Sequence, residues 1–126
     1  MKYIFTLTLL FISGRTFSQI DIELRDISKH IGDSVKVVGK IYGGKYLEQV
    51  KGSPTFLNVG GDYPDVPLTL VIWSDVRKQF YQQMPEVVLK GKECWIYGKV
   101  ELYKGRPQMV IHNPSQIHEP VKVDVN

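Results

Sequence analysis

Apolar and polar residues alternate strictly in the first long apolar segment after residue 30. Between Ser34 and Tyr42, one side carries Val35, Val37, Gly39 and Ile41, and the other carries Lys36, Val38, Lys40 and Tyr42. Successive side chains of a β-strand point to opposite faces, so this pattern predicts a strand with one buried face. Gly32-Asp33 predicts a turn before it. Gly43-Gly44 ends the pattern, and residues 45–54 are predicted to form a loop.

Two shorter β-branched segments, Thr55–Val59 and Leu68–Ser74, predict the second and third strands. In the second strand, Leu57 and Val59 share one face, while Phe56 and Asn58 share the other. Two interpretations remain open: Leu57 and Val59 fill the core and Phe56 is exposed, or a bulge shifts the alternation and buries Phe56. Trp73, on the face of Thr69 and Val71, has the same ambiguity.

The periodicity changes in residues 75–88, where Val76, Phe80 and Met84 recur at four-residue spacing. This spacing predicts one amphipathic helix that ends near Pro85. Glu93–Tyr103 and Pro107–His112 then predict two strands joined by a tight turn at Lys104-Gly105. Three strands, a helix and two strands indicate an all-β fold, a five-stranded Greek-key barrel with one helix between strands three and four.

The first 18 residues have the pattern of an export signal. Lys2 precedes an apolar run over residues 3–12, and Thr16-Phe17-Ser18 follows. The run is shorter than the roughly 20 residues that span a bilayer. A buried N-terminal strand or helix is the alternative. We therefore expect a secreted or periplasmic protein without a stable membrane anchor, with a signal peptide at 1–18, a lead-in at 19–31, the domain at 32–117 and a tail at 118–126.

Charge and titratable residues favour non-covalent binding over catalysis. The formal charge is +3, but Lys2 and Arg15 lie in the predicted signal, so the remainder carries 14 cations and 13 anions. Cys94 is the only cysteine and is expected to be a buried thiol. The histidines follow no metal-ligand spacing, and turns and a helix start explain Asp62, Asp65 and Asp75. The sequence predicts no enzyme activity, no cofactor and no metal.

Six segments, taken in order around the predicted helix, carry a resemblance to a known family. They are Gly32–Lys40, Thr55–Gly61, Leu68–Trp73, Leu89–Lys92, Tyr97–Val100 and Tyr103–Gln108. Together they resemble the OB-fold nucleic-acid-binding domain family, including its anticodon-binding type, over residues 32–117. The resemblance implies a ligand site on the face of strands two and three. It also implies that Phe56, the aromatic residue at a base-stacking position of related domains, is exposed.

Single-strand binding needs aromatic platforms for bases and cations for phosphates. The candidate ligand-binding residues are Lys40, Tyr42, Phe56, Asn58, Thr69, Trp73, Tyr103, Lys104 and Arg106, with Lys45 as a further cation near the same face. A solvated rim would also explain the cations, and amphipathic packing the tyrosines. The leading hypothesis is a non-catalytic module for single-stranded nucleic acid. The alternatives are an envelope interaction protein that binds a peptide, glycan or protein on this face, and an accessory domain of a secreted nuclease.

The export hypothesis predicts the mass of the mature protein. Protein recovered from outside the cytoplasm should begin within a few residues of Gln19, because the apolar run and the short residues before Gln19 are typical of a cleaved signal. Intact-mass spectrometry measures this directly. Folded cytoplasmic protein that retains Met1 would contradict the prediction.

Overall fold

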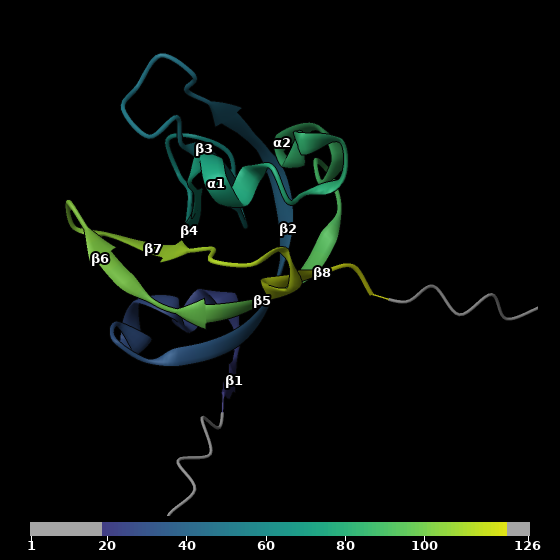
Figure 1. The fold of residues 1–126 in the computed structure, drawn as a ribbon. Coiled ribbons are helices and arrows are strands. Elements are labelled where there is room, and N and C mark those ends of the chain that lie inside the picture. The colour runs from purple at the N-terminus through teal and green to yellow at the C-terminus, as the bar shows by residue number, and fades with distance from the viewer. Residues whose placement is uncertain (1–18, 121–126) are drawn as a thin grey trace, which may run out of the picture.

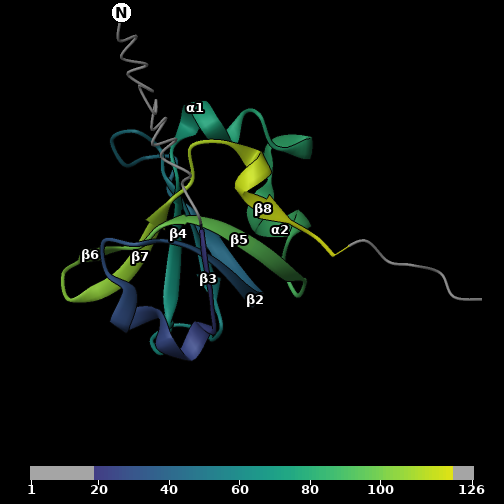
Figure 2. The same cartoon turned by 90° about the horizontal axis from the view of Figure 1, so that it is seen from below.

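The computed structural model describes residues 19–120, so the predicted signal peptide and residues 121–126 of the predicted tail lie outside the described part. Eight strands form one mixed sheet in the order β6-β7-β4-β3-β2-β5-β8, with β1 beside β2 (Figures 1 and 2). The strands are β1 (Ile20–Ile22), β2 (Ser34–Tyr46), β3 (Thr55–Val59), β4 (Leu68–Ile72), β5 (Glu93–Lys99), β6 (Glu101–Tyr103), β7 (Arg106–Val110) and β8 (Ile117–His118). The predicted β-rich fold is confirmed, but the described chain has more strands than the five expected.

β2 is the strand on which most of the sheet is assembled. Residues 34–40 pair with β5, whereas Ile41 and residues 43–46 pair with β3, with a register shift between Ile41 and Gly43. β4 lies antiparallel to β3 and parallel to β7, and β1 lies parallel to β2. The loop expected from residue 45 begins later, because Lys45 and Tyr46 pair with Phe56 and Thr55 and extend β2.

The segment predicted as one strand over Glu93–Tyr103 is two strands, because Val100 between them pairs with no strand. Its side chain is fully buried. Its N–H donates to the carbonyl of Asp33, and its carbonyl accepts from Gly32, at 2.9 and 2.7 Å. Val100 thus bonds to the turn that opens β2. β5 before it pairs with β2, and β6 after it pairs with β7.

Side-chain alternation along β3 and β4 fills the core from one face of the sheet. Leu57 and Val59 of β3 and Leu70 and Ile72 of β4 each have 0% exposure. Burying such a side chain contributes about 1.5–3 kcal/mol relative to leaving it exposed. This settles the open interpretation of the second strand, because Phe56 projects from the outer face and is only partly buried.

Cys94 of β5 lies in the same core, as expected for a structural thiol. Its exposure is 0%. Removal from water, together with the charge of Glu119, raises the pKa of the Cys94 thiol to about 11. The nucleophilic thiolate is therefore scarce at neutral pH, and Cys94 acts as a small apolar residue.

The single helix expected over residues 75–88 is wrong. This segment forms α1 (Ser74–Arg77), a 3₁₀ turn η2 (Tyr81–Gln83) and α2 (Pro85–Val88). Gln82 and Gln83 have φ of 56° and 54°, which lies outside the α-helical region. Pro85 begins α2 instead of ending a helix, because its fixed φ suits a first helical turn and disfavours helical backbone at Met84. Two further 3₁₀ helices are η1 (Leu24–His30), in the predicted lead-in, and η3 (Pro114–Gln116).

An ion pair between a buried arginine and a partly buried glutamate holds the two short α-helices together. Arg77 of α1 donates to both carboxylate oxygens of Glu86 of α2, at 2.5 and 2.9 Å. In a continuous helix, residues nine positions apart would lie about 13.5 Å apart along the axis. The fold-back at η2 is therefore what allows this pair to meet. The same guanidinium donates to the Thr55 hydroxyl at 2.8 Å and lies 3.6 Å from the centre of the Tyr46 ring.

The environment of Glu86 favours its ionised form. Burial raises the pKa of the carboxyl, but the hydrogen bonds and charge of Arg77, with a backbone hydrogen bond, outweigh burial and bring the pKa below its usual value of 4.5. None of the helices within residues 19–120 is long and apolar enough to cross a membrane.

The ion pair predicts asymmetric effects of single and double substitutions. Arg77→Met should lower the free energy of unfolding by about 3 kcal/mol, because it leaves a partly buried carboxylate and the buried Thr55 hydroxyl without their partner. Arg77→Met combined with Glu86→Leu should recover part of this loss, since no unpaired charge then remains although the Thr55 hydroxyl still lacks its donor. Urea unfolding of both variants and the wild type measures the difference. Equal stability of the single and double variants would contradict the prediction.

The pH dependence of unfolding provides the control. Because the folded-state pKa of Glu86 is depressed, its stabilising contribution is complete above pH 4.5 and is lost as pH falls through the folded-state value. Glu86→Gln should remove this component and flatten the acid limb of the stability curve. An acid limb that is unchanged in Glu86→Gln would show that Glu86 does not titrate with folding.

Candidate functional site

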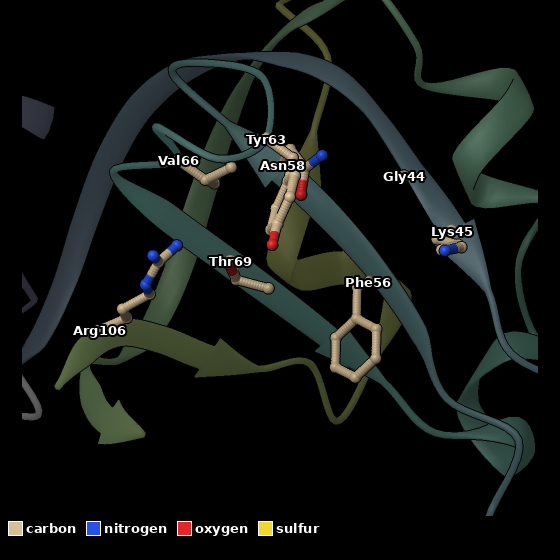
Figure 3. Close-up of a pocket in the computed structure, with 8 residues that line it drawn as sticks. All are labelled: Gly44, Lys45, Phe56, Asn58, Tyr63, Val66, Thr69 and Arg106. Carbon is tan, nitrogen blue, oxygen red and sulfur yellow. The ribbon is translucent and has the colours of Figure 1, made fainter. Parts of the chain in front are cut away.

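A hollow of about 650 Å³ lies over the outer faces of β3 and β4 (Figure 3). Its walls come from three neighbouring strands, from β7 and from the loop that joins β3 to β4. The lining residues are Gly44 and Lys45 of β2, Phe56 and Asn58 of β3, Thr69 of β4, Arg106 of β7, and Tyr63 and Val66 of the loop. A volume of this size falls within the roughly 300–1,000 Å³ typical of small-ligand sites.

Local sequence explains why these side chains face the hollow. Phe56, Asn58 and Thr69 occupy the outward positions of strands whose inward positions fill the core. Gly44 lies close to β3: a Cβ there would stand 2.2 Å from the backbone oxygen of Phe56. Any larger residue would push β2 away from β3. Glycine at this position lets the two strands pair closely and leaves the hollow free of a side chain here.

Arg106 links the β7 side of the hollow to the loop above it. Its Nη1 donates to the Pro64 carbonyl at 3.0 Å. A guanidinium has five N–H donors, so this bond leaves others for a ligand. Lys45 lies on the opposite side of the hollow in Figure 3. The site therefore has a cation on each side of an aromatic and amide surface.

A second hollow of about 230 Å³ adjoins the first. Phe56, Thr69 and Arg106 line both, and Tyr103, Lys104, Pro107 and Gln108 line the second alone. The β6–β7 turn places Lys104, with φ of 48° at Lys104 and 77° at Gly105, as in a two-residue type I′ hairpin. The tight turn predicted at Lys104-Gly105 is thus confirmed. Lys104 Nζ lies 5.5 Å from the centre of the Tyr103 ring.

Six of the nine candidate residues gather around these two hollows, and three do not. Lys40 and Tyr42 line neither hollow. They lie next to each other on β2, with Lys40 Nζ 5.1 Å from the centre of the Tyr42 ring. Trp73 follows β4 and is 42% exposed. Its ring lies against Gly52 of the β2–β3 loop, whose Cβ would stand 2.9 Å from it.

Sequence reasoning missed five lining residues: Gly44, Tyr63, Val66, Pro107 and Gln108. Tyr63 and Val66 lie outside the strands. Both belong to the turn-rich connection between β3 and β4, which carries no strand periodicity. Tyr63 is 78% exposed. The sequence did contain a signal for Tyr63. An aromatic residue between Gly61 and Pro64, in a connection too polar to form core, indicates a ring at the surface.

The side chains that line the two hollows can stack, donate and accept hydrogen bonds and pair with anions. Aromatic rings, amides, a hydroxyl and cations line them. Among residues 19–120, no group of three or more His, Cys, Asp or Glu residues is arranged to hold a metal ion. Aromatic rings beside cations are the groups that bind planar, negatively charged ligands.

The sequence matches no family model and no curated protein. The fold is similar to a solved structure assigned as an aspartyl-tRNA synthetase from Leishmania major Friedlin, with a TM-score of 0.52 and 10% sequence identity. The match covers 85% of this chain and 22% of that chain. At this identity the likeness concerns the fold alone.

Proposed function

We propose that the sheet is a five-stranded Greek-key OB barrel in which β5 and β6 together form the fourth strand. The pairings support this assignment. β2 pairs with β3 and β5, β3 with β4, β4 with β7, and β7 with β6, which follows β5 after one residue. Joining β5 to β6 across Val100 completes a circuit of five strands, as in this fold. The short helical segments follow the third strand, where an OB fold has its helix.

We further propose that the protein is a non-catalytic module that binds single-stranded nucleic acid on the β3–β4 face. The observation that carries this proposal is the convergence of Phe56, Asn58, Thr69 and Arg106 on one hollow. Its supports outside the site are the resemblance to anticodon-binding OB domains and the fold likeness to an enzyme named for a tRNA substrate. Fold alone does not determine function, so the weight rests on the residues of the hollow.

In this proposal, the bases stack on Phe56 and the cations meet the phosphates. Base stacking tolerates every base, because each has an aromatic face, and contributes about 1–3 kcal/mol per base. Export would place this binding outside the cytoplasm. There, a peptide, glycan or envelope protein is the competing occupant of the same face.

Loss of the Phe56 ring should weaken binding with little dependence on base identity. Phe56→Ala should raise the Kd for labelled dT12 and U12 by the equivalent of about 1–3 kcal/mol, because one stacking platform is removed. Fluorescence anisotropy measures the Kd. Phe56→Leu, which keeps an apolar side chain of similar length without an aromatic face, should show most of the same loss.

Thermal unfolding of both Phe56 variants is the necessary control. Phe56 projects away from the core, so both variants should remain folded. If both fold and bind dT12 and U12 as tightly as wild type, Phe56 is no stacking platform. If wild type binds no strand at low ionic strength, the nucleic-acid proposal is wrong, and a panel of peptides and glycans becomes the informative measurement.

The Lys104 charge should contribute to the salt dependence of binding. Lys104→Asn removes the cation while keeping a residue that tolerates positive φ in this turn. The log–log slope of affinity against salt should flatten by about 0.7, the value for one phosphate contact on a single strand. Anisotropy titrations over a salt series measure the slope. The matched control is Lys78→Asn, an exposed cation that lines neither hollow, and its slope should equal that of wild type.

A further inference from the structure

From the two adjoining hollows we infer that the site is built for two consecutive nucleotides, one base in each hollow, with Arg106 at the phosphate that joins them. This inference rests on the proposed function and specifies its ligand. The hollow of about 650 Å³ and the hollow of about 230 Å³ meet at three residues, Phe56, Thr69 and Arg106. A ligand that fills both must pass these residues.

The two hollows repeat the same set of chemical groups. The larger one has its own tyrosine, amide and lysine, which are Tyr63, Asn58 and Lys45. The smaller one also has its own tyrosine, amide and lysine, which are Tyr103, Gln108 and Lys104. A single compact ligand has no use for this duplication. A polymer with one planar group and one negative charge per unit uses both sets.

Strand register gives this repetition a regular spacing. Asn58 of β3 pairs with Thr69 of β4, and Thr69 pairs with Gln108 of β7. The three polar residues thus form a row across adjacent strands, with Thr69 at the centre. Neighbouring strands lie about 4.8 Å apart, so the two amides stand about two strand spacings from each other. Each amide offers both donors and an acceptor to the edge of a base.

The position of Arg106 suits it to the joining phosphate. It borders both hollows, and its Nη1 bond to the Pro64 carbonyl holds the guanidinium at the boundary. A pre-positioned guanidinium loses less side-chain freedom when it binds a phosphate than a free lysine does. Lys45 and Lys104 then stand beside the outer phosphates, one at each hollow.

A length series tests this directly. The Kd of pT, pTpT and pTpTpT, and of the uridine equivalents, is measured by calorimetry. The Kd should fall by about tenfold or more from one to two nucleotides, because a second base gains its own stacking platform. It should fall less than about threefold from two to three. Equal Kd values for one and two nucleotides would overturn the inference.

The role of Arg106 is tested with an uncharged linkage. In wild type, replacing the joining phosphate of pTpT by a methylphosphonate should weaken binding by about as much as Arg106→Gln does. In Arg106→Gln, the same replacement should have little further effect, whereas Arg106→Lys should keep part of the sensitivity. Lys78→Gln is the control and should respond to the methylphosphonate as wild type does. If the methylphosphonate weakens binding equally in wild type and in Arg106→Gln, Arg106 does not contact the joining phosphate.

The outcomes separate this inference from the function on which it rests. If dT12 and U12 bind while the length series shows no step at two nucleotides, the two-nucleotide site is wrong and the binding function stands. If dT12 and U12 do not bind at low ionic strength, both are wrong.

Discussion

The buried guanidinium of Arg77 is the interaction on which the arrangement of this protein depends most. A charge that is almost removed from water is stable only when its hydrogen-bond donors are matched, and here Glu86, Thr55 and the Tyr46 ring match them. Those partners belong to α2, β3 and β2. The ion pair therefore fixes the two helices over the end of the sheet. The Arg77 guanidinium also contacts Tyr46 of β2 and Thr55 of β3, which pair with each other. The next pair along these strands, Lys45 and Phe56, lines the hollow.

The candidate site follows from the same strands by simple alternation. Thr55, Leu57 and Val59 point inward and are fully buried, which leaves Phe56 and Asn58 no alternative to the outer face. A slip of one residue in β3 would bury Asn58 and expose Leu57, at a cost of several kcal/mol. The same alternation therefore stabilises the core and fixes the direction of the outward side chains at the candidate site. This explains how a small domain can hold that surface rigid without a disulfide among its described residues.

Sequence reasoning succeeded where the determining interactions are local. Alternation in Ser34–Tyr42 and Thr55–Val59 and the Lys104-Gly105 turn follow from short-range pattern. The buried Cys94 follows from its being the only cysteine. It failed where contacts between distant residues decide. The helix over 75–88 breaks at Gln82 and Gln83, ahead of Pro85, and the Arg77–Glu86 ion pair joins the two short helices that result. The hydrophobic spacing of this segment carries no sign of that pair. Trp73 was assigned to the ligand face by strand parity, but β4 ends before it.

The distribution of charge around the hollows bears on how the site would hold a nucleic acid. Residues 19–126 carry 14 cations against 13 anions, so this part of the chain supplies almost no long-range attraction for a polyanion. Three cations, Lys45, Lys104 and Arg106, line the two hollows, and no carboxylate does. Three phosphate contacts give a log–log salt slope of only about 2 for a single strand. At physiological salt, most of the affinity in the proposed complex must therefore come from stacking on Phe56 and the two tyrosines. In the proposed complex, the apolar and amide character of the hollows, more than the net charge, would decide which ligands the face accepts.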